Sequence, residues 1–220
     1  MKSVILVGGG YSIKEGIEQD LWHQIHCQDI WSINYAFKTM PYLPSKQIWV
    51  DSTFFKSNMD ELEALYKAGI ECHTKAKPVY DNIPVIKQWN MVRDEFYDKK
   101  MIEVNKLYGG AMGLSGMLAL SLAYNMDYDT IFLLGYDYGT SSTNDLNTHY
   151  YQDDKINYTS VGVRNPSVYM NDTGVKSNVR DFDNFKHPAT KIYNVSMTSH
   201  IKAFEKITYE QMFKLLKGTV

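Results

Sequence analysis

The chain has little cysteine and little proline, and it lacks a long apolar run. Only 2 of its 220 residues are Cys and 6 are Pro. Cys27 and Cys72 form no CxxC or Cys/His pattern, which argues against a disulfide-rich secreted domain and a structural zinc site. The longest apolar region, Met112 to Tyr124, is broken by glycine and serine, so no transmembrane segment is predicted. We expect a cytoplasmic protein.

An excess of positive charge is also absent. The sequence has 23 Lys and Arg residues against 25 Asp and Glu residues, a formal net charge of −2. Binding to the phosphate backbone of a duplex needs a basic surface, so duplex nucleic acid is disfavoured as a partner. A chain of this length with 44% hydrophobic residues can bury one full core. We therefore expect one domain over residues 1–220, and the sequence leaves a homo-oligomer open.

Short apolar segments rich in β-branched and aromatic residues alternate with helical patterns, which predicts an α/β fold of the Rossmann-like, doubly wound type with a mostly parallel sheet. Strands are predicted at Ser3–Val7, Ile30–Ile33, Gln47–Val50 and Thr130–Leu134, and weaker ones at Lys191–Val195, Ile70–His73 and Val85–Trp89. Helices are predicted at Lys14–His23, Met59–Lys67 and Gly113–Asn125, and in two pieces within Ser199–Leu216 with a turn near Thr208.

Residues 139–188 break this alternation. They are rich in Ser, Thr, Asn, Asp and Tyr and have few aliphatic side chains. Inside a compact domain, a long segment of this kind is more often a functional lid or binding loop than a linker. We expect a lid-like insertion before the last strand.

Three glycines follow the first predicted strand, in the stretch VILVGGGYSIKE at residues 4–15. Ser12 and Glu15 have the spacing of a capping box, so Ser12 is expected to cap the first helix while Glu15 reaches back to it. Gly8–Gly10 then lie in the strand-to-helix turn, where free amides bind a phosphate or a carboxylate. The expected ligand is an anion, and a tight turn without a ligand is the alternative.

Two common nucleotide-binding signatures are missing from this turn. Ile13 stands where the dinucleotide fingerprint has its third glycine, and the second strand is followed by Asn34 instead of an acidic residue, which disfavours NAD. No GxxxxGK[ST] pattern occurs, which excludes a P-loop NTPase.

Small or polar residues also follow the other strands. In an open α/β sheet, the carboxyl ends of the strands share one edge, and ligands bind in the crevice outside it. Asp137 at this edge has a carboxylate suited to an acceptor hydroxyl or to orienting the lid, with a local Asx turn as the alternative. The edge residues are Gly8–Gly10, Asn34, Asp51–Thr53, Gly135–Asp137, Asn194 and Ser196.

Within residues 139–188 and just before them, a histidine and several tyrosines are candidates for the site. An unperturbed imidazole has a pKa of about 6.5, which suits His149 to act as a general base. The alternative is an ordinary histidine in a surface loop. Tyr138, Tyr150 and Tyr151 have rings that stack on a base or sugar and hydroxyls that bind phosphate.

The motifs, taken in order, resemble those of bacterial sialyltransferases of the Campylobacter type. They also resemble the wider group of sialyltransferase-like and pterin-pyrophosphokinase-like proteins, many of them encoded by phages. The resemblance spans nearly the whole chain. Its motifs are GGGYSIKE at 8–15, Asn34, DSTFF at 51–55, LSG at 114–116, LLGYDYG at 133–139, THYY at 148–151 and KIYNVSMTSHIKAF at 191–204.

The resemblance implies a glycosyltransferase that uses a CMP-sugar donor and a hydroxyl-bearing acceptor, which is a glycan or a small molecule. It implies general-base catalysis by His149, next to Tyr150, without a metal or another cofactor. It assigns the donor phosphate to Gly8, Gly9, Gly10 and Ser12, the nucleoside to Asn34, Asp51 and Ser52, and the surroundings of the donor to Ser115 and Gly116.

The chain departs from the family pattern at several places. Gly9 and Tyr11 stand where the family has Asn and Pro, and Asp51 stands where Asn is common. Gly139 occupies the position of a phosphate-binding tyrosine, with Tyr138 beside it. Asp127–Tyr128–Asp129 looks like the D-x-D motif of other glycosyltransferases. However, it precedes the fourth predicted main strand, at the opposite edge from the site, so a helix-to-strand turn is predicted there.

Two alternatives remain open at this stage. A pyrophosphokinase-like enzyme would use ATP and Mg²⁺ to modify a hydroxymethyl heterocycle, with Asp51 and Asp137 near the phosphates. A catalytically silent protein would bind a nucleotide without turnover and would tolerate substitution of His149.

Overall fold

The computed structural model describes residues 2–74, 114–138, 150, 179–185, 187 and 189–218. Within these ranges, strands β1 to β7 form one sheet in the order β4-β3-β2-β1-β5-β6-β7, and every pairing is parallel. This confirms the predicted α/β, Rossmann-like class. The strands are β1 (Ser3–Val7), β2 (Ile30–Ile33), β3 (Lys46–Trp49), β4 (Glu71–Thr74), β5 (Thr130–Leu134), β6 (Lys191–Asn194) and β7 (Glu205–Lys206).

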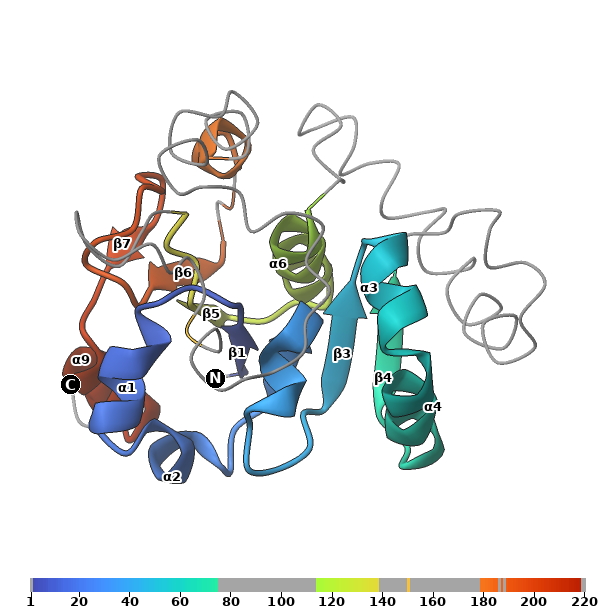
Figure 1. Ribbon diagram of the computed structural model, residues 1–220. Helices are drawn as coiled ribbons and strands as arrows, with labels where there is room; N and C mark the ends of the chain where they lie inside the picture. The colour runs from blue at the N-terminus through green and yellow to red at the C-terminus, as the bar shows by residue number, and fades with distance from the viewer. Residues whose placement is uncertain are drawn as a thin grey trace, which may run out of the picture.

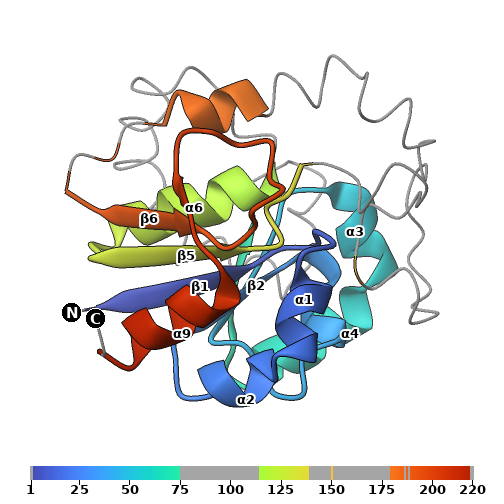
Figure 2. The same ribbon diagram turned by 90° about the vertical axis from the view of Figure 1, so that its left-hand side faces the viewer.

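Helices cover both faces of the sheet, as Figures 1 and 2 show. In Figure 2, α6 lies on one face, and α1, α2 and α9 lie on the other. Residues 179–183 form a further helical turn. The helices are α1 (Ile13–Glu18), α2 (Leu21–Ile25), the 3₁₀ helix η1 (Asn34–Lys38), α3 (Ser52–Ser57), α4 (Met59–Lys67), α6 (Ser115–Asn125) and α9 (Tyr209–Leu216).

The sheet separates two hydrophobic cores, and the central strand β1 contributes to both. Ile5 and Val7 pack into the core beneath α1, α2 and α9, whereas Val4 and Leu6 pack into the core beneath α6. Successive side chains of a strand point to opposite faces, so a strand covered on both faces must be apolar throughout. This is why the strand appears in the sequence as a continuous apolar run.

Most predicted elements lie where the pattern placed them. The bounds of β1, β2, β5 and α4 match the predicted ranges, and β3, β4 and β6 differ from theirs by one residue at one or both ends. The predicted strand Val85–Trp89 lies outside the described residues. So does most of the predicted lid, of which residue 150 and parts of 179–187 are described.

Two helix predictions are wrong. The predicted helix Lys14–His23 is interrupted after Glu18, because Asp20 adopts a left-handed conformation (φ 60°) between α1 and α2. The first helical piece predicted after Ser199 is absent, since β7 lies there and pairs with β6. The turn near Thr208 is confirmed.

Thr208 is the residue that starts α9, and it does so through a capping box. The Gln211 amide donates to the Thr208 hydroxyl (3.2 Å), and the Thr208 amide donates to Oε1 of Gln211 (2.8 Å). Among the residues that the structure describes, no helix has the length and apolar character needed to cross a membrane.

Candidate functional site

The carboxyl ends of β1 and β5 meet at the centre of the sheet. From β1 the chain runs outward through β2 and β3 to β4, then returns to the other side of β1 as β5. Val7 and Leu134 are paired neighbours at the ends of these strands. Such a reversal of strand order is where open α/β sheets bind ligands. The predicted glycine turn and the residues after β5 therefore lie side by side at this point.

The two loops are joined by backbone hydrogen bonds. The Gly8 amide donates to Leu134 O (2.8 Å), and the Gly10 amide donates to Gly135 O (2.9 Å). Gly135 has a left-handed backbone (φ 68°). Among the described residues, the amides of Gly9 and Tyr11 have no acceptor. They are the two amides of this turn that remain for an anionic ligand.

Asp137 holds the next residue of the turn, Ser12. Its carboxylate is almost fully buried and accepts from the Ser12 amide (2.7 Å) and from the Ser12 hydroxyl (2.6 Å). The predicted capping box of Ser12 with Glu15 is wrong, since the Ser12 side chain makes no cap bond to α1. The protein thus supplies its own carboxylate at the start of α1. Asp137 therefore positions the glycine turn through its two hydrogen bonds with Ser12.

Asn34, predicted to hold the nucleoside, and Ser115, predicted to lie beside the donor, are in direct contact. The Ser115 hydroxyl donates to Oδ1 of Asn34 (2.9 Å) and accepts from the Val50 amide (3.0 Å). One buried hydroxyl therefore ties the ends of β2 and β3 to the start of α6. It also fixes the side-chain amide of Asn34, a half-buried residue. Among the described residues, no acceptor is bonded to its Nδ2. This nitrogen is an oriented donor at the edge of the sheet.

Two tyrosines that follow β5 pack on the start of α6. The Tyr136 hydroxyl donates to Gly116 O (3.1 Å), and burial raises the pKa of Tyr136 well above its usual value, so it remains a donor. A Cβ built on Gly116 would lie 3.2 Å from the Tyr138 hydroxyl. Gly116 therefore allows the approach of Tyr138, which has a left-handed backbone (φ 49°). Two predicted site residues, Gly116 and Tyr138, are brought together here.

Tyr150 lies against the glycine turn, with its side chain in the core. Its amide donates to Gly9 O (3.0 Å), and its hydroxyl forms a hydrogen bond with Thr39. The side chain is 1% exposed, so the structure favours a packing role for it, and ligand contact by Tyr150 stays a prediction. His149 and Tyr151 lie outside the described residues.

The other two predicted residues follow β3. Asp51 is exposed at the end of the strand, and its carbonyl accepts from the Phe55 amide (3.1 Å). Ser52 opens α3. Both lie at the carboxyl edge of the sheet, as the sequence predicts.

Sequence reasoning missed Tyr209 of α9, which packs behind this site. Its ring lies against α1 so closely that a Cβ built on Gly16 would be 2.4 Å from Cε1 of Tyr209. Burial and the nearby Asp137 carboxylate raise the pKa of Tyr209 well above its usual value. Gly16, a glycine inside a helical pattern, is the signal from which a close contact could have been predicted here.

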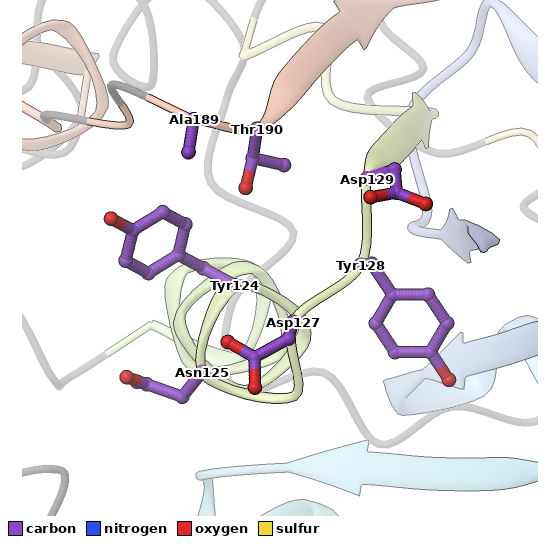
Figure 3. Close-up of a pocket in the computed structure, with 7 residues that line it drawn as sticks. All are labelled: Tyr124, Asn125, Asp127, Tyr128, Asp129, Ala189 and Thr190. Atoms are coloured by element: carbon purple, nitrogen blue, oxygen red, sulfur yellow. The ribbon is translucent and has the colours of Figure 1, made fainter. Parts of the chain in front are cut away.

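At the opposite edge of the sheet, Asp127, Tyr128 and Asp129 line a pocket of about 230 Å³ (Figure 3). They connect the end of α6 to the start of β5, which confirms the predicted helix-to-strand turn. In the part of the chain that the structure describes, no three His, Cys, Asp or Glu side chains are grouped to hold a metal ion.

Asp127 gives a stability prediction. It has a left-handed backbone (φ 56°) just after the end of α6, and a carboxylate is unfavourable at this negative end of a helix. Asp127→Gly removes both costs, so we expect the free energy of unfolding to rise by about 0.5–1 kcal/mol in urea denaturation. Asp20→Gly is the matched control, since Asp20 (φ 60°) lies at the start of α2, where a carboxylate is favoured. A larger gain from Asp20→Gly would contradict the charge argument.

The comparisons with known proteins concern the fold. No protein-family model matches the sequence, and no curated protein matches it. A solved structure, the monofunctional alpha-2,3-sialyltransferase Cst-I from Campylobacter jejuni, is similar with a TM-score of 0.51 and 14% identity. The match covers 91% of this chain and 78% of that chain. At this identity the likeness shows a shared fold, in agreement with the α/β class predicted from the sequence.

Proposed function

We propose that the chain is a nucleotide-dependent glycosyltransferase, with a CMP-sugar-like donor bound along the carboxyl ends of β1, β2 and β3. The observation that carries the proposal is the Asn34 amide. Ser115 holds it (2.9 Å) so that Nδ2 remains a donor, at the same edge as the glycine turn. An oriented donor of this kind suits the polar groups of a nucleoside, because polar groups in a binding site fix the ligand's orientation.

The donor phosphate is placed on the amides of Gly9 and Tyr11. The acceptor hydroxyl is deprotonated by His149 and attacks the anomeric carbon, while the nucleotide leaves. Such a transfer depends on positioning and on stabilising the leaving phosphate. The shared fold with a sialyltransferase and the location beside the reversal of strand order support this arrangement.

Nucleotide binding is the direct test. CMP at about 100 times its Kd should stabilise the native state by about 2.7 kcal/mol, which corresponds to a rise in Tm of roughly 5–10 °C for a chain of this size. Thermal shift and titration calorimetry would measure it. ATP with Mg²⁺ should have a smaller effect.

Asn34→Asp is the matched variant for the same experiment. It keeps an oxygen for Ser115 and a residue type that tolerates the left-handed backbone at this position (φ 53°), but it removes the donor and adds a negative charge. We expect CMP affinity to fall at least about tenfold, the scale of a lost bond to a charged or polar partner. Stronger binding of ATP with Mg²⁺ would favour the pyrophosphokinase alternative. Binding of CMP-sugars without any transfer would favour a silent binding protein.

A further inference from the structure

Asp137 is a buried carboxylate directly beside the amides proposed to hold the ligand's phosphate. It is 6% exposed, and Oδ2 lies 2.7 Å from the Ser12 amide. A Cβ built on Gly10 would be 2.6 Å from the same oxygen. Tyr11 lies between Gly10 and Ser12 in the chain. A phosphate oxygen bound to the Tyr11 amide would therefore lie within about 8 Å of the carboxylate, given the spacing of successive residues and the length of a hydrogen bond.

The carboxylate is held in place by its surroundings. Both of its oxygens accept from Ser12, and the carbonyl of Asp137 accepts from the His200 amide (2.8 Å). Rotation away from the turn would leave the Ser12 amide and hydroxyl without an acceptor, which is costly in a buried place. The negative charge consequently stays where it is when a ligand binds.

No described basic side chain is paired with this carboxylate. The ammonium of Lys14 lies 4.8 Å from the centre of the Tyr11 ring, and no ion pair between Asp137 and a basic side chain is formed among the described residues. The carboxylate therefore repels each added negative charge on a ligand. At about 6–8 Å in a partly hydrated site, one extra charge is disfavoured by a factor on the order of ten.

We propose that Asp137 is a specificity-determining residue that selects ligands with a single negative charge at the glycine turn. This rests on the proposed function and deepens it. A phosphodiester, as in a nucleoside monophosphate linked to a sugar, carries one charge there. A free nucleoside monophosphate carries about two, and a di- or triphosphate carries more. The carboxylate favours the intact donor over the free nucleotide that transfer releases, and so it limits inhibition by that product.

A charge series of cytidine nucleotides tests the proposal at pH 8. The probes are the methyl ester of CMP, CMP, CDP and CTP, measured by titration calorimetry on the full chain. The wild-type protein should bind the methyl ester more tightly than CMP by about tenfold, with CDP and CTP weaker still. Equal affinities across the series, or tighter binding of CTP than of the methyl ester, would overturn the proposal from the wild-type measurements alone.

Asp137→Asn is the matched variant. It keeps an oxygen for Ser12 and removes the charge, so the preference for the methyl ester over CMP should shrink about tenfold. Asp20→Asn is the control, because it removes one negative charge from an exposed position at the start of α2, and its preference should be that of the wild type. A preference that is the same in wild type and Asp137→Asn would overturn the role of Asp137 and leave the proposed function standing. Failure of every cytidine nucleotide to bind the wild-type protein would overturn both.

Discussion

Gly10→Ala should lower the free energy of unfolding by at least about 3 kcal/mol, the upper range for a forced overlap in a packed site. A Cβ at this position would lie 2.6 Å from Gly135 O and 2.7 Å from Gly135 C. Both are backbone atoms at the end of the central strand β5, which is paired on both sides. They cannot move aside as a flexible side chain does, so the two loops would separate. Urea denaturation would measure the loss.

Gly69→Ala is the control for this substitution. Gly69 has a left-handed backbone (φ 86°), but a Cβ there would meet nothing within 4 Å. It should cost about 1 kcal/mol, the price of the conformation alone. If the Gly10→Ala protein is no less stable than the Gly69→Ala protein, the loops that carry Gly10 and Gly135 are farther apart than in the structure.

The second large effect is on catalysis. His149→Ala should reduce the rate of sugar transfer by about 10²–10⁴-fold, the usual contribution of a general base. His149 itself lies outside the described residues. Its neighbour Tyr150 donates its amide to Gly9 O (3.0 Å) and so lies at the glycine turn. The rate should be measured with a donor identified by the binding experiment.

His23→Ala provides the comparison, since His23 is exposed on α2, the helix that leads to the start of β2. Its transfer rate should equal that of the wild type, and its Tm should stay within about 2 °C of the wild-type value, as expected for an exposed position. A folded His149→Ala protein with full transfer activity would remove the general-base role.

The sequence predicted the strands well because their physical signal is local. β1, β2 and β5 are short apolar runs that end in Gly or Asn, and burial on both faces demands that composition. β7 could not be predicted, because it has two residues and exists through its pairing with β6. The break at Asp20 was missed for a different reason. The helical spacing of apolar residues continues across Asp20 into α2, so the sequence pattern gives no sign of an interruption.

The candidate site was predicted as a set of residues but not as a set of contacts. The bond from Ser12 to Asp137 joins residues 125 positions apart, and no spacing in the sequence reports it. Ser12 and Thr208 both carry a capping-box pattern, yet only Thr208 forms one. At Ser12, the buried carboxylate of Asp137, in the loop after β5, accepts from the hydroxyl instead, because hydrogen bonds to charged groups are the stronger ones.

The pairing of β1 with β5 also governs how the chain can fold during synthesis. Ser3 pairs with Thr130, so β1 waits for this neighbour until the segment that separates the two strands has been synthesised. At about 5–20 residues per second, that delay is roughly 6–25 s. Until then one edge of a mostly apolar strand is unpaired, and unpaired strand edges of this kind are prone to aggregation.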